Sequence, residues 1–387
     1  MLEYLAYGLT GVLIGVFTGL IPGLHPNSVI FGSIPLYLGF GLDFMLYACL
    51  VSGLSISHTF HDFIPAFYLQ APEGGTALSM SVGGEMASNG RGTEAFYSTL
   101  LGGVGSLFVF VLSLPLLYLS LELAYGFFKG FMSYFLLFFL LFMVFRSDRF
   151  EGFVVAVLSG VLGLLVLNSS ISGSFVLMPV FSGLFAVPAV VSSVFSGSEV
   201  PDQSDGGGFS GVRGGVVGFF AGLLAGVFPG LGAAGSTSFL MPLIEDKKDF
   251  LAGMGGVNTS DIVMSFVSLF LIGKARSGAS VALQGLRPTV EWQVFALIGV
   301  SVFCAGFSAL LALRSEKVFL NVLDRVRFRF VGVLVLLFLF VGSWLFSGVF
   351  GVLVLLVSSL IGGYSFLVDC RSVCMAVLLV PAIVFFL

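Results

Sequence analysis

The chain has 387 residues, of which 58% are apolar and 9% charged, whereas about 25% of the residues in a typical globular domain are charged. Its 45 phenylalanines and 52 glycines are typical of helices packed in lipid, where glycine lets backbones approach and aromatic rings fill the remaining space. Soluble, disordered, collagen-like and disulfide-rich classes are therefore excluded. The net charge of −4, with 16 thinly spread Lys and Arg residues, offers no basic stripe for nucleic acid. An all-α polytopic membrane protein is expected.

Apolar stretches long enough to cross a membrane cover most of the chain. The N-terminal Met1-Leu2-Glu3-Tyr4 lacks the basic residues of a cleaved signal peptide, so the first stretch is expected to be retained. A spanning helix needs about 20 mostly apolar residues. Uninterrupted candidates are residues 97–121, 131–145, 150–167, 174–195, 290–313, 331–349, 350–367 and 372–387. Proline, glycine and polar residues interrupt residues 4–40, 44–91, 213–244 and 250–286.

Two polar stretches organise the chain. The longest, Ser196 to Arg213, contains three consecutive glycines and reads as a flexible connection. We therefore expect a first transmembrane repeat at 1–195, a polar linker at 196–212 and a second repeat at 213–387. The run from Arg314 to Arg329 is strongly basic, so the positive-inside rule places it in the cytoplasm of a multi-pass protein of the plasma membrane.

An internal repeat relates the two halves. A single ungapped shift of the sequence aligns identical residues of the two halves. Those in the first half are Gly8, Gly11, Gly15, Gly19, Pro22, Gly23, Leu24, Pro35 and Leu36, and they align, in the same order, with Gly215, Gly218, Gly222, Gly226, Pro229, Gly230, Leu231, Pro242 and Leu243. Glycine-rich membrane helices can resemble one another by chance, but the shared Pro-Gly-Leu favours duplication. The equivalent loops differ in charge, since residues 121–130 carry one lysine whereas 314–329 are basic. This predicts two repeats of inverted topology.

The Pro-Gly-Leu elements are expected to break their helices. Pro22 and Pro229 interrupt apolar runs and lack the amide that a continuous helix uses. Broken or re-entrant helices at membrane depth are tolerated beside protein or a watery cavity. Because the N-terminus of a half-helix offers free amides and partial positive charge, the breaks predict an anion site.

Small polar residues and two cations near the breaks are the candidate substrate-binding residues. They are Gly23, Leu24, His25, Asn27, Ser28, Gly74, Gly75 and Thr76 in the first half, and Gly230, Gly232, Gly235, Ser236, Asn258, Lys274, Arg276, Ser277 and Gly278 in the second. Hydroxyls and free amides can wrap an oxyanion. Lys274 and Arg276 are the candidate charge partners, although both could instead extend to lipid headgroups.

Four ionisable residues are the candidates for coupling transport to an ion: His58, His61, Asp62 and Asp261. Ionisable groups inside a membrane are costly and usually serve a ligand, an ion or a proton. A location at the membrane interface, where such groups need no function, is the alternative. His58 and His61 could also hold a metal, but the spacing of a four-ligand site is absent. We expect no metal centre and no cofactor, with Na⁺ or H⁺ as the coupling ion.

Enzyme motifs do not fit this context. Residues 230–235 match GxGxxG, but they follow a membrane helix instead of a strand, so they are not a dinucleotide site. No P-loop occurs in the sequence. An intramembrane enzyme acting on lipid phosphate through His58 or His61 is the least favoured class. We therefore expect a transporter and no catalytic residues.

Several of these motifs together carry a family resemblance. Pro22-Gly23-Leu24 after a glycine-rich helix, the stretch from Gly74-Gly75-Thr76 to Ala95, and Pro229-Gly230-Leu231-Gly232 resemble the large membrane subunit of tripartite tricarboxylate transporters. The resemblance implies cation-coupled import of citrate-like carboxylates, with a small membrane subunit and a secreted binding protein as partners. It also implies half-sites at Pro22 to Leu24 with residues 74–76, and at Pro229 to Leu231 with Asn258, Ser277 and Gly278.

Broken helices with Pro-Gly elements are also similar to those of polyprenyl-phosphate translocases. Both resemblances imply an anionic ligand and an inverted repeat. A citrate site must be closed off from lipid, whereas a lipid-carrier site needs a sideways opening with a cationic headgroup pocket. We expect a secondary transporter of a small organic anion, with a prenyl-phosphate translocase as the alternative. Membrane lipids are expected partners, and a homodimer is an alternative assembly.

Overall fold

The computed structural model describes residues 2–22, 24–71, 75–76, 78–147, 149–169, 173–196, 201–204, 211–240, 244–286, 291–323 and 328–387. The predicted site residues Gly23 and Gly74, and the side chain of Ser28, lie outside this described part. The described segments contain helices and no strand, and six of these helices are long and apolar enough to cross a membrane. The chain is therefore an all-α, multi-pass membrane protein.

The N-terminal half begins with a helix that ends just before Pro22. A new helix starts at Pro26, with His25 as its N-cap, so the first predicted break lies between these two helices. The elements of this half are α1 (Leu2–Leu20), α2 (Pro26–Phe40), α3 (Phe44–His61), α4 (Phe63–Tyr68), α5 (Ser79–Ser88), α6 (Gly92–Lys129), α7 (Met132–Arg146), α8 (Arg149–Leu167), α9 (Gly173–Phe181), the π-helical turn η1 (Ser182–Ala186) and α10 (Val187–Ser196).

The C-terminal half has its own break around Pro229. One helix ends at Val227 and the next begins at Gly232. The elements are α11 (Val212–Val227), α12 (Gly232–Leu240), α13 (Lys247–Leu271), α14 (Gly278–Leu286), α15 (Glu291–Leu323), α16 (Phe328–Leu367), the 3₁₀ turn η3 (Arg371–Met375) and α17 (Ala376–Phe386). Element α16 covers both spans predicted at 331–349 and 350–367, and the non-helical backbone of Gly348 (φ 61°, ψ −153°) divides it into two helices close to the predicted boundary.

Glycine faces bring two pairs of helices into close contact. A Cβ at Gly11 of α1 would lie 2.8 Å from the backbone nitrogen of Leu54 in α3, and one at Gly218 of α11 would lie 2.6 Å from the carbonyl of Gly253 in α13. These residues match each other in the sequence repeat. Small residues therefore let α1 pack on α3 and α11 on α13 with their backbones almost touching.

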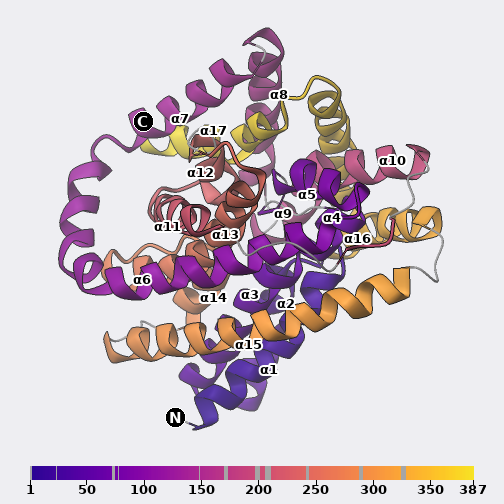
Figure 1. The fold of residues 1–387 in the computed structure, drawn as a ribbon. Coiled ribbons are helices and arrows are strands. Elements are labelled where there is room, and N and C mark those ends of the chain that lie inside the picture. Colours follow the sequence, from indigo (N-terminus) through magenta and orange to yellow (C-terminus); the bar gives the residue numbers. More distant parts are fainter. Residues whose placement is uncertain are drawn as a thin grey trace.

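Each half also packs on the long helix of the other half. Helix α15 lies against α1 and α3, whereas α6 lies against α11 and α13. Figure 1 shows α6 and α15 as the two long helices that flank these packed groups. Farther along the chain, two more helices of the C-terminal half contact the N-terminal half: α16 packs on α9 and α10, and α17 packs on α7 and α8. The halves are interlocked and do not form two separate bundles.

The direction of the packed helices differs between the halves. Gly8 and Gly19 of α1 lie against the beginning and the end of α3, so these two helices are parallel, and the contacts of α11 with α13 have the same order. Helices α3 and α13 run in opposite directions. The end of α3, at Asp62, is bonded to Asn258, whereas its beginning shares a hydrophobic cluster with Phe266 and Leu269 farther along α13.

Polar contacts hold the linker and the start of α13 against the turn between α5 and α6. Gln203 accepts a hydrogen bond from Gly92 N at 2.6 Å, and Ser204 N donates to Gly90 O at 2.8 Å. Lys247 forms an ion pair with Glu85 at 2.8 Å, and Lys248 forms one with Glu94. Residues 201–204 are therefore anchored, although the glycine-rich composition predicts a flexible connection.

Candidate functional site

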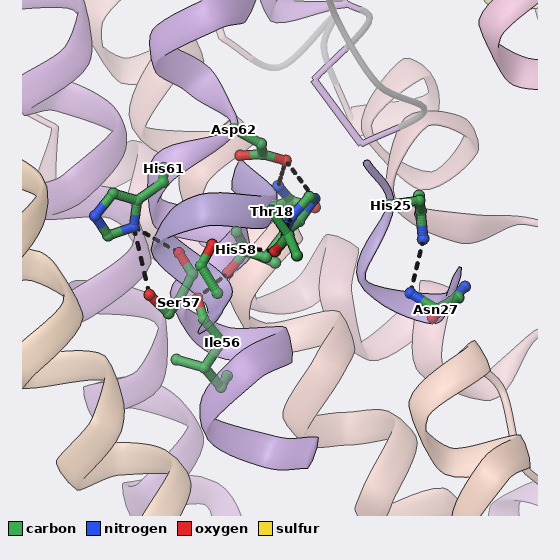
Figure 2. Close-up of polar contacts among 11 residues, drawn as sticks. Thr18, His25, Asn27, Ile56, Ser57, His58, His61 and Asp62 are labelled. Atoms are coloured by element: carbon green, nitrogen blue, oxygen red, sulfur yellow. Dashed lines mark hydrogen bonds and ion pairs between the residues drawn. The ribbon is translucent and has the colours of Figure 1, made fainter. Parts of the chain in front are cut away.

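A buried polar cluster lies where the end of α3 meets α1 and α13. His58 Nδ1 is 3.1 Å from the hydroxyl of Thr18, and His58 Nε2 is 3.9 Å from Asp62 Oδ2. Asn258 Nδ2 donates a hydrogen bond to the same carboxylate oxygen at 3.1 Å. All four side chains are buried. We call Thr18, His58, Asp62 and Asn258 the central cluster; Figure 2 shows how His58 and Asp62 lie beside Thr18.

Helical spacing and glycine packing position this cluster. His58 and Asp62 are four residues apart at the end of α3 and therefore lie on one face of it. Gly19, next to Thr18, brings α1 close enough that its Cβ would lie 3.0 Å from His58 O. Gly75 packs against the other side, because a Cβ there would lie 3.1 Å from Cγ of Asn258. The N-terminal half thus encloses an amide contributed by the C-terminal half.

The first break adjoins the central cluster. His25 Nδ1 accepts a hydrogen bond from Asn27 N at 3.2 Å, which caps α2. The ring of His25 lies 5.9 Å from the ring of His58. Asn27 packs directly against Gly278, at the start of α14. The predicted residues His25, Asn27 and Gly278 are therefore close together, although they come from both halves.

A group of serine hydroxyls surrounds the start of α14. Ser265 Oγ of α13 lies 2.8 Å from Ser277 Oγ and 2.6 Å from Ser280 Oγ. The backbone amides of Arg276 and Ser277 donate to Ser280 Oγ and Ser265 Oγ at 3.0 Å and 2.8 Å. These two amides at the start of α14 are thus bonded to hydroxyls, whereas the sequence predicts free amides for an anion.

The two predicted cations have different surroundings. Arg276 Nη2 donates a hydrogen bond to Tyr125 OH at 3.2 Å, and its guanidinium carbon lies 5.7 Å from the centre of the same ring. Tyr125 belongs to α6, so this contact also joins the two halves. Lys274 is exposed. Arg276 is therefore the better placed of the two to balance charge inside the protein.

Polar residues of α13 form a line between these groups. Asn258, Asp261 and Ser265 are three and four residues apart and share one face of the helix. Asn258 belongs to the central cluster and Ser265 to the hydroxyl group. Asp261 lies between them, and its Oδ1 has no hydrogen-bond partner within the described part of the chain. This face of α13 connects the two polar groups.

The predicted residues of the second break have other neighbours. A Cβ at Gly230 would lie 2.9 Å from the carbonyl of Leu378 in α17, and Ser236 Oγ donates to Gly232 O of its own helix at 2.9 Å. Gly235 packs against Leu231. The second break is therefore held against α17 and against its own turn. Leu24, at the first break, is half-buried.

His61 points away from the central cluster (Figure 2). Its Nδ1 lies 2.7 Å from the backbone carbonyl of Ser57. Of the four predicted coupling residues, the structure brings together His58 and Asp62, whereas His61 Nε2 and Asp261 Oδ1 have no hydrogen-bond partner within the described part of the chain. Within the described residues, no group of three or more His, Cys, Asp and Glu side chains could hold a metal ion.

Comparison with known proteins identifies the family. Residues 5–377 match the tripartite tricarboxylate transporter TctA family. The chain belongs to the TctA family. It is also 28% identical to an uncharacterised protein of Methanocaldococcus jannaschii, over 99% of each chain. No solved structure matches it. The TctA family is a transport family, so the chain is a membrane transport protein, as the resemblance of its motifs predicts.

Sequence reasoning on this TctA member missed Thr18, Ser265, Ser280 and Tyr125. Two of them carry a signal in helical spacing: Thr18 is four residues before Pro22, and Ser265 is seven residues after Asn258. Tyr125 carries none, because its contact with Arg276 joins helices from opposite halves. Only the folded chain reveals that pair.

Proposed function

We propose that this chain is the permease of a secondary transporter that moves a small organic anion, a tricarboxylate or dicarboxylate, together with Na⁺ or H⁺. The observation that carries the proposal is the hydrogen bond between Asp62 and Asn258, a buried contact between the two halves of a TctA-family chain. A buried carboxylate is costly in a membrane and usually serves transport. Its location between two interlocked halves fits a site that opens when the halves move.

We further propose that the halves are inverted repeats, with a first repeat at 1–195, a linker at 196–212 and a second repeat at 213–387. The opposite directions of α3 and α13 support this topology, as does the parallel packing within each half. Inverted repeats commonly place the substrate and the coupling ion at their interface. In this topology the basic segment from Arg314 to Arg329 lies in the cytoplasm and the chain in the plasma membrane.

The proposed anion site lies between the first break and α14. His25, Asn27 and Gly278 are close together there, and Arg276 supplies positive charge beside Ser277. Asp62 with His58, and Asp261 on α13, would hold the coupling charge. A small membrane subunit and a secreted binding protein are the proposed partners, as the family name implies a tripartite system.

Ligand-dependent thermal stabilisation tests the proposal. Purified protein is heated with citrate, succinate or a long-chain prenyl phosphate, each with and without Na⁺. A ligand at about 100 times its Kd stabilises the folded state by roughly 2.7 kcal/mol, so a binder should raise the unfolding temperature clearly. Stabilisation by citrate or succinate is expected. The proposal is wrong if neither carboxylate has an effect at any salt or pH while the prenyl phosphate stabilises.

A groove beside the first break favours a second candidate, a polyprenyl-phosphate translocase. The groove has a volume of about 560 Å³, and its lining is formed by apolar residues of α1, α15 and α16 with Ile21, Pro22 and Leu69. Val322 and Leu337 in this lining are more than half exposed, so the groove is open to its surroundings. A hydrocarbon chain fits such a lining. The prenyl phosphate in the experiment above separates this candidate from the first.

A further inference from the structure

A second line of buried polar groups runs along the contact between α15 and the helices α3 and α4. Ser52 Oγ lies 2.6 Å from Ser301 Oγ, and Tyr68 OH donates a hydrogen bond to Glu316 Oε1 at 2.6 Å. These four side chains are at most 1% exposed. The two pairs have nearly the same offset along the chain, so α15 runs beside α3 and α4 in the same direction. We call this contact the α3–α15 seam.

His61 lies at a level between these two pairs. His61 comes seven residues before Tyr68. On α15, the position seven residues before Glu316, the partner of Tyr68, is Ala309, which is next to Ser308. His61 and Ser308 are both 0% exposed. The Nε2 atom of His61 and the hydroxyl of Ser308 have no hydrogen-bond partner among the residues that the structure describes. Two such atoms at one level of a buried contact point to a shared ligand.

The tautomer of His61 follows from its other nitrogen. A backbone carbonyl can only accept a hydrogen bond, so Nδ1, at 2.7 Å from Ser57 O, carries the proton in the neutral ring. Nε2 then offers a lone pair. A Cβ at Gly19 would lie 2.6 Å from His61 Cβ, so α1 packs tightly against His61. The ring is held in place with its basic nitrogen turned away from Asp62 (Figure 2).

The chemistry of one imidazole nitrogen and one hydroxyl decides the class of ligand. Sodium, like other hard cations, is bound by several oxygen atoms, whereas the lone pair of a neutral histidine nitrogen binds a proton. A water molecule needs two or more polar partners in a buried site, and His61 and Ser308 supply two. The site therefore suits a proton delivered through water.

Few ionisable groups lie at the level of His61 on the described helices around it. They are His58 and Asp62 at the end of α3, Tyr68 on α4 and Glu316 on α15. Helix α1 contributes Gly19 and Thr18 at this level, neither of which is ionisable. Arg314 and Lys317 of α15 are exposed. Glu316 is the carboxylate on the seam, and Asp62 is the carboxylate on the opposite side of His61.

We propose that the coupling ion of this transporter is the proton and that His61 is its binding site, which Ser308 and the Tyr68–Glu316 pair connect to one end of the seam. This inference rests on the proposed function. The proton binds to Nε2 of His61, and the positive charge of the ring offsets the negative charge of Asp62, the next residue of the chain. The His61 ring returns to its neutral form when the proton leaves from the same nitrogen, so no other reactant is needed.

The direct test is the protonation state of His61. The chain has three histidines, so protein labelled with ¹⁵N-histidine in lipid bilayers gives three imidazole groups, and His61→Gln identifies one of them by its loss. We expect Nε2 of His61 to gain a proton as the pH falls through the range in which uptake proceeds. Ser308→Ala should shift that titration, whereas Ser343→Ala, a buried serine of α16, should not. A His61 ring that stays neutral throughout overturns the proposal.

Uptake into proteoliposomes that also contain the proposed small membrane subunit, with the binding protein supplied outside, gives the second test. An inward pH gradient is expected to drive citrate or succinate uptake, and His61→Gln should reduce this uptake by roughly 5- to 150-fold, the usual range of coupling between two ligands. Ser308→Ala should also reduce uptake, and it replaces His61→Gln in this test if that variant does not fold. The Ser343→Ala variant is the matched control.

The results separate the two proposals. If a Na⁺ gradient drives uptake equally in the wild type and in His61→Gln, and a pH gradient drives none, the proton site is wrong while the proposed function stands. If the wild type takes up no carboxylate under either gradient, the proposed function fails. The ¹⁵N titration then still decides whether His61 binds a proton.

Discussion

The two groups α1–α3 and α11–α13 are built alike but carry different chemistry. Both have a glycine face, a break around Pro-Gly-Leu and a third helix parallel to the first. The first group carries His58 and Asp62 beside its break, whereas the break of the second packs against α17. The polar residues of the second group lie on α13 instead. Backbone packing is thus shared, while the polar groups of one site are divided between the halves.

The largest difference between the groups should appear at their aspartates. Asp62→Asn removes the negative charge of the carboxylate that accepts a hydrogen bond from Asn258. Ion-coupled uptake into proteoliposomes is therefore expected to fall to background, with normal expression of the variant. Asp261→Asn should reduce uptake less, because Asp261 lies outside the central cluster. Equal uptake by Asp62→Asn and the wild type would remove Asp62 from the transport mechanism.

The two cations next to α14 give the second comparison. Arg276→Gln removes the guanidinium that is bonded to Tyr125, and the apparent affinity for the carboxylate should fall roughly 5- to 150-fold. Lys274→Gln is the matched control, because Lys274 is exposed and should change affinity little. Titration of uptake against substrate concentration measures both. The reverse order of effects would assign the charge to Lys274.

The shared glycine face predicts equal effects in both groups. Gly11→Ala and Gly218→Ala place a methyl group against the backbone of the partner helix, and such overpacking costs about 1–3 kcal/mol. Gly32→Ala in α2 meets no atom within 4 Å, so it is the control and should not destabilise. Thermal unfolding in detergent compares the three variants. A large effect in only one group would argue against equivalent packing.

The smallest effect is expected at the surface contact between the halves. Lys247 and Glu85 form an ion pair 2.8 Å long, and both side chains are more than half exposed. Exposed pairs contribute about 0.2–1 kcal/mol and are screened by salt. Lys247→Ala should therefore lower the unfolding temperature slightly at low ionic strength and not at high. A loss that persists in high salt would indicate packing of the lysine stem.

Much of the helical framework could be predicted from the sequence. Proline lacks an amide, so the breaks around Pro22 and Pro229 follow from local chemistry, and the glycine pattern follows from the close packing of helices. The boundary predicted at residues 349–350 lies one or two residues after Gly348, whose non-helical backbone separates two helices within α16. Glycine adopts a positive φ without steric cost, so this break also follows from local chemistry.

The site was harder to predict because its contacts join distant parts of the chain. His58 and Asp62 are four residues apart, so their proximity is readable from the sequence, but Asn258 reaches Asp62 only through the crossing of α3 and α13. The pairing of Arg276 with Tyr125 has the same origin. The position of His61 on a different side of α3 depends on its rotamer, which the sequence does not specify.

The interlocking of the halves also has a consequence for biosynthesis. Ser52 and its partner Ser301 are separated by 249 residues, which a ribosome making about 5–20 residues per second needs roughly 12 to 50 seconds to add. During that interval the α3 surface that later contacts α15 has no native neighbour. The nascent chain therefore passes through a period in which polar side chains such as Ser52 depend on lipid headgroups, water or insertion factors for protection.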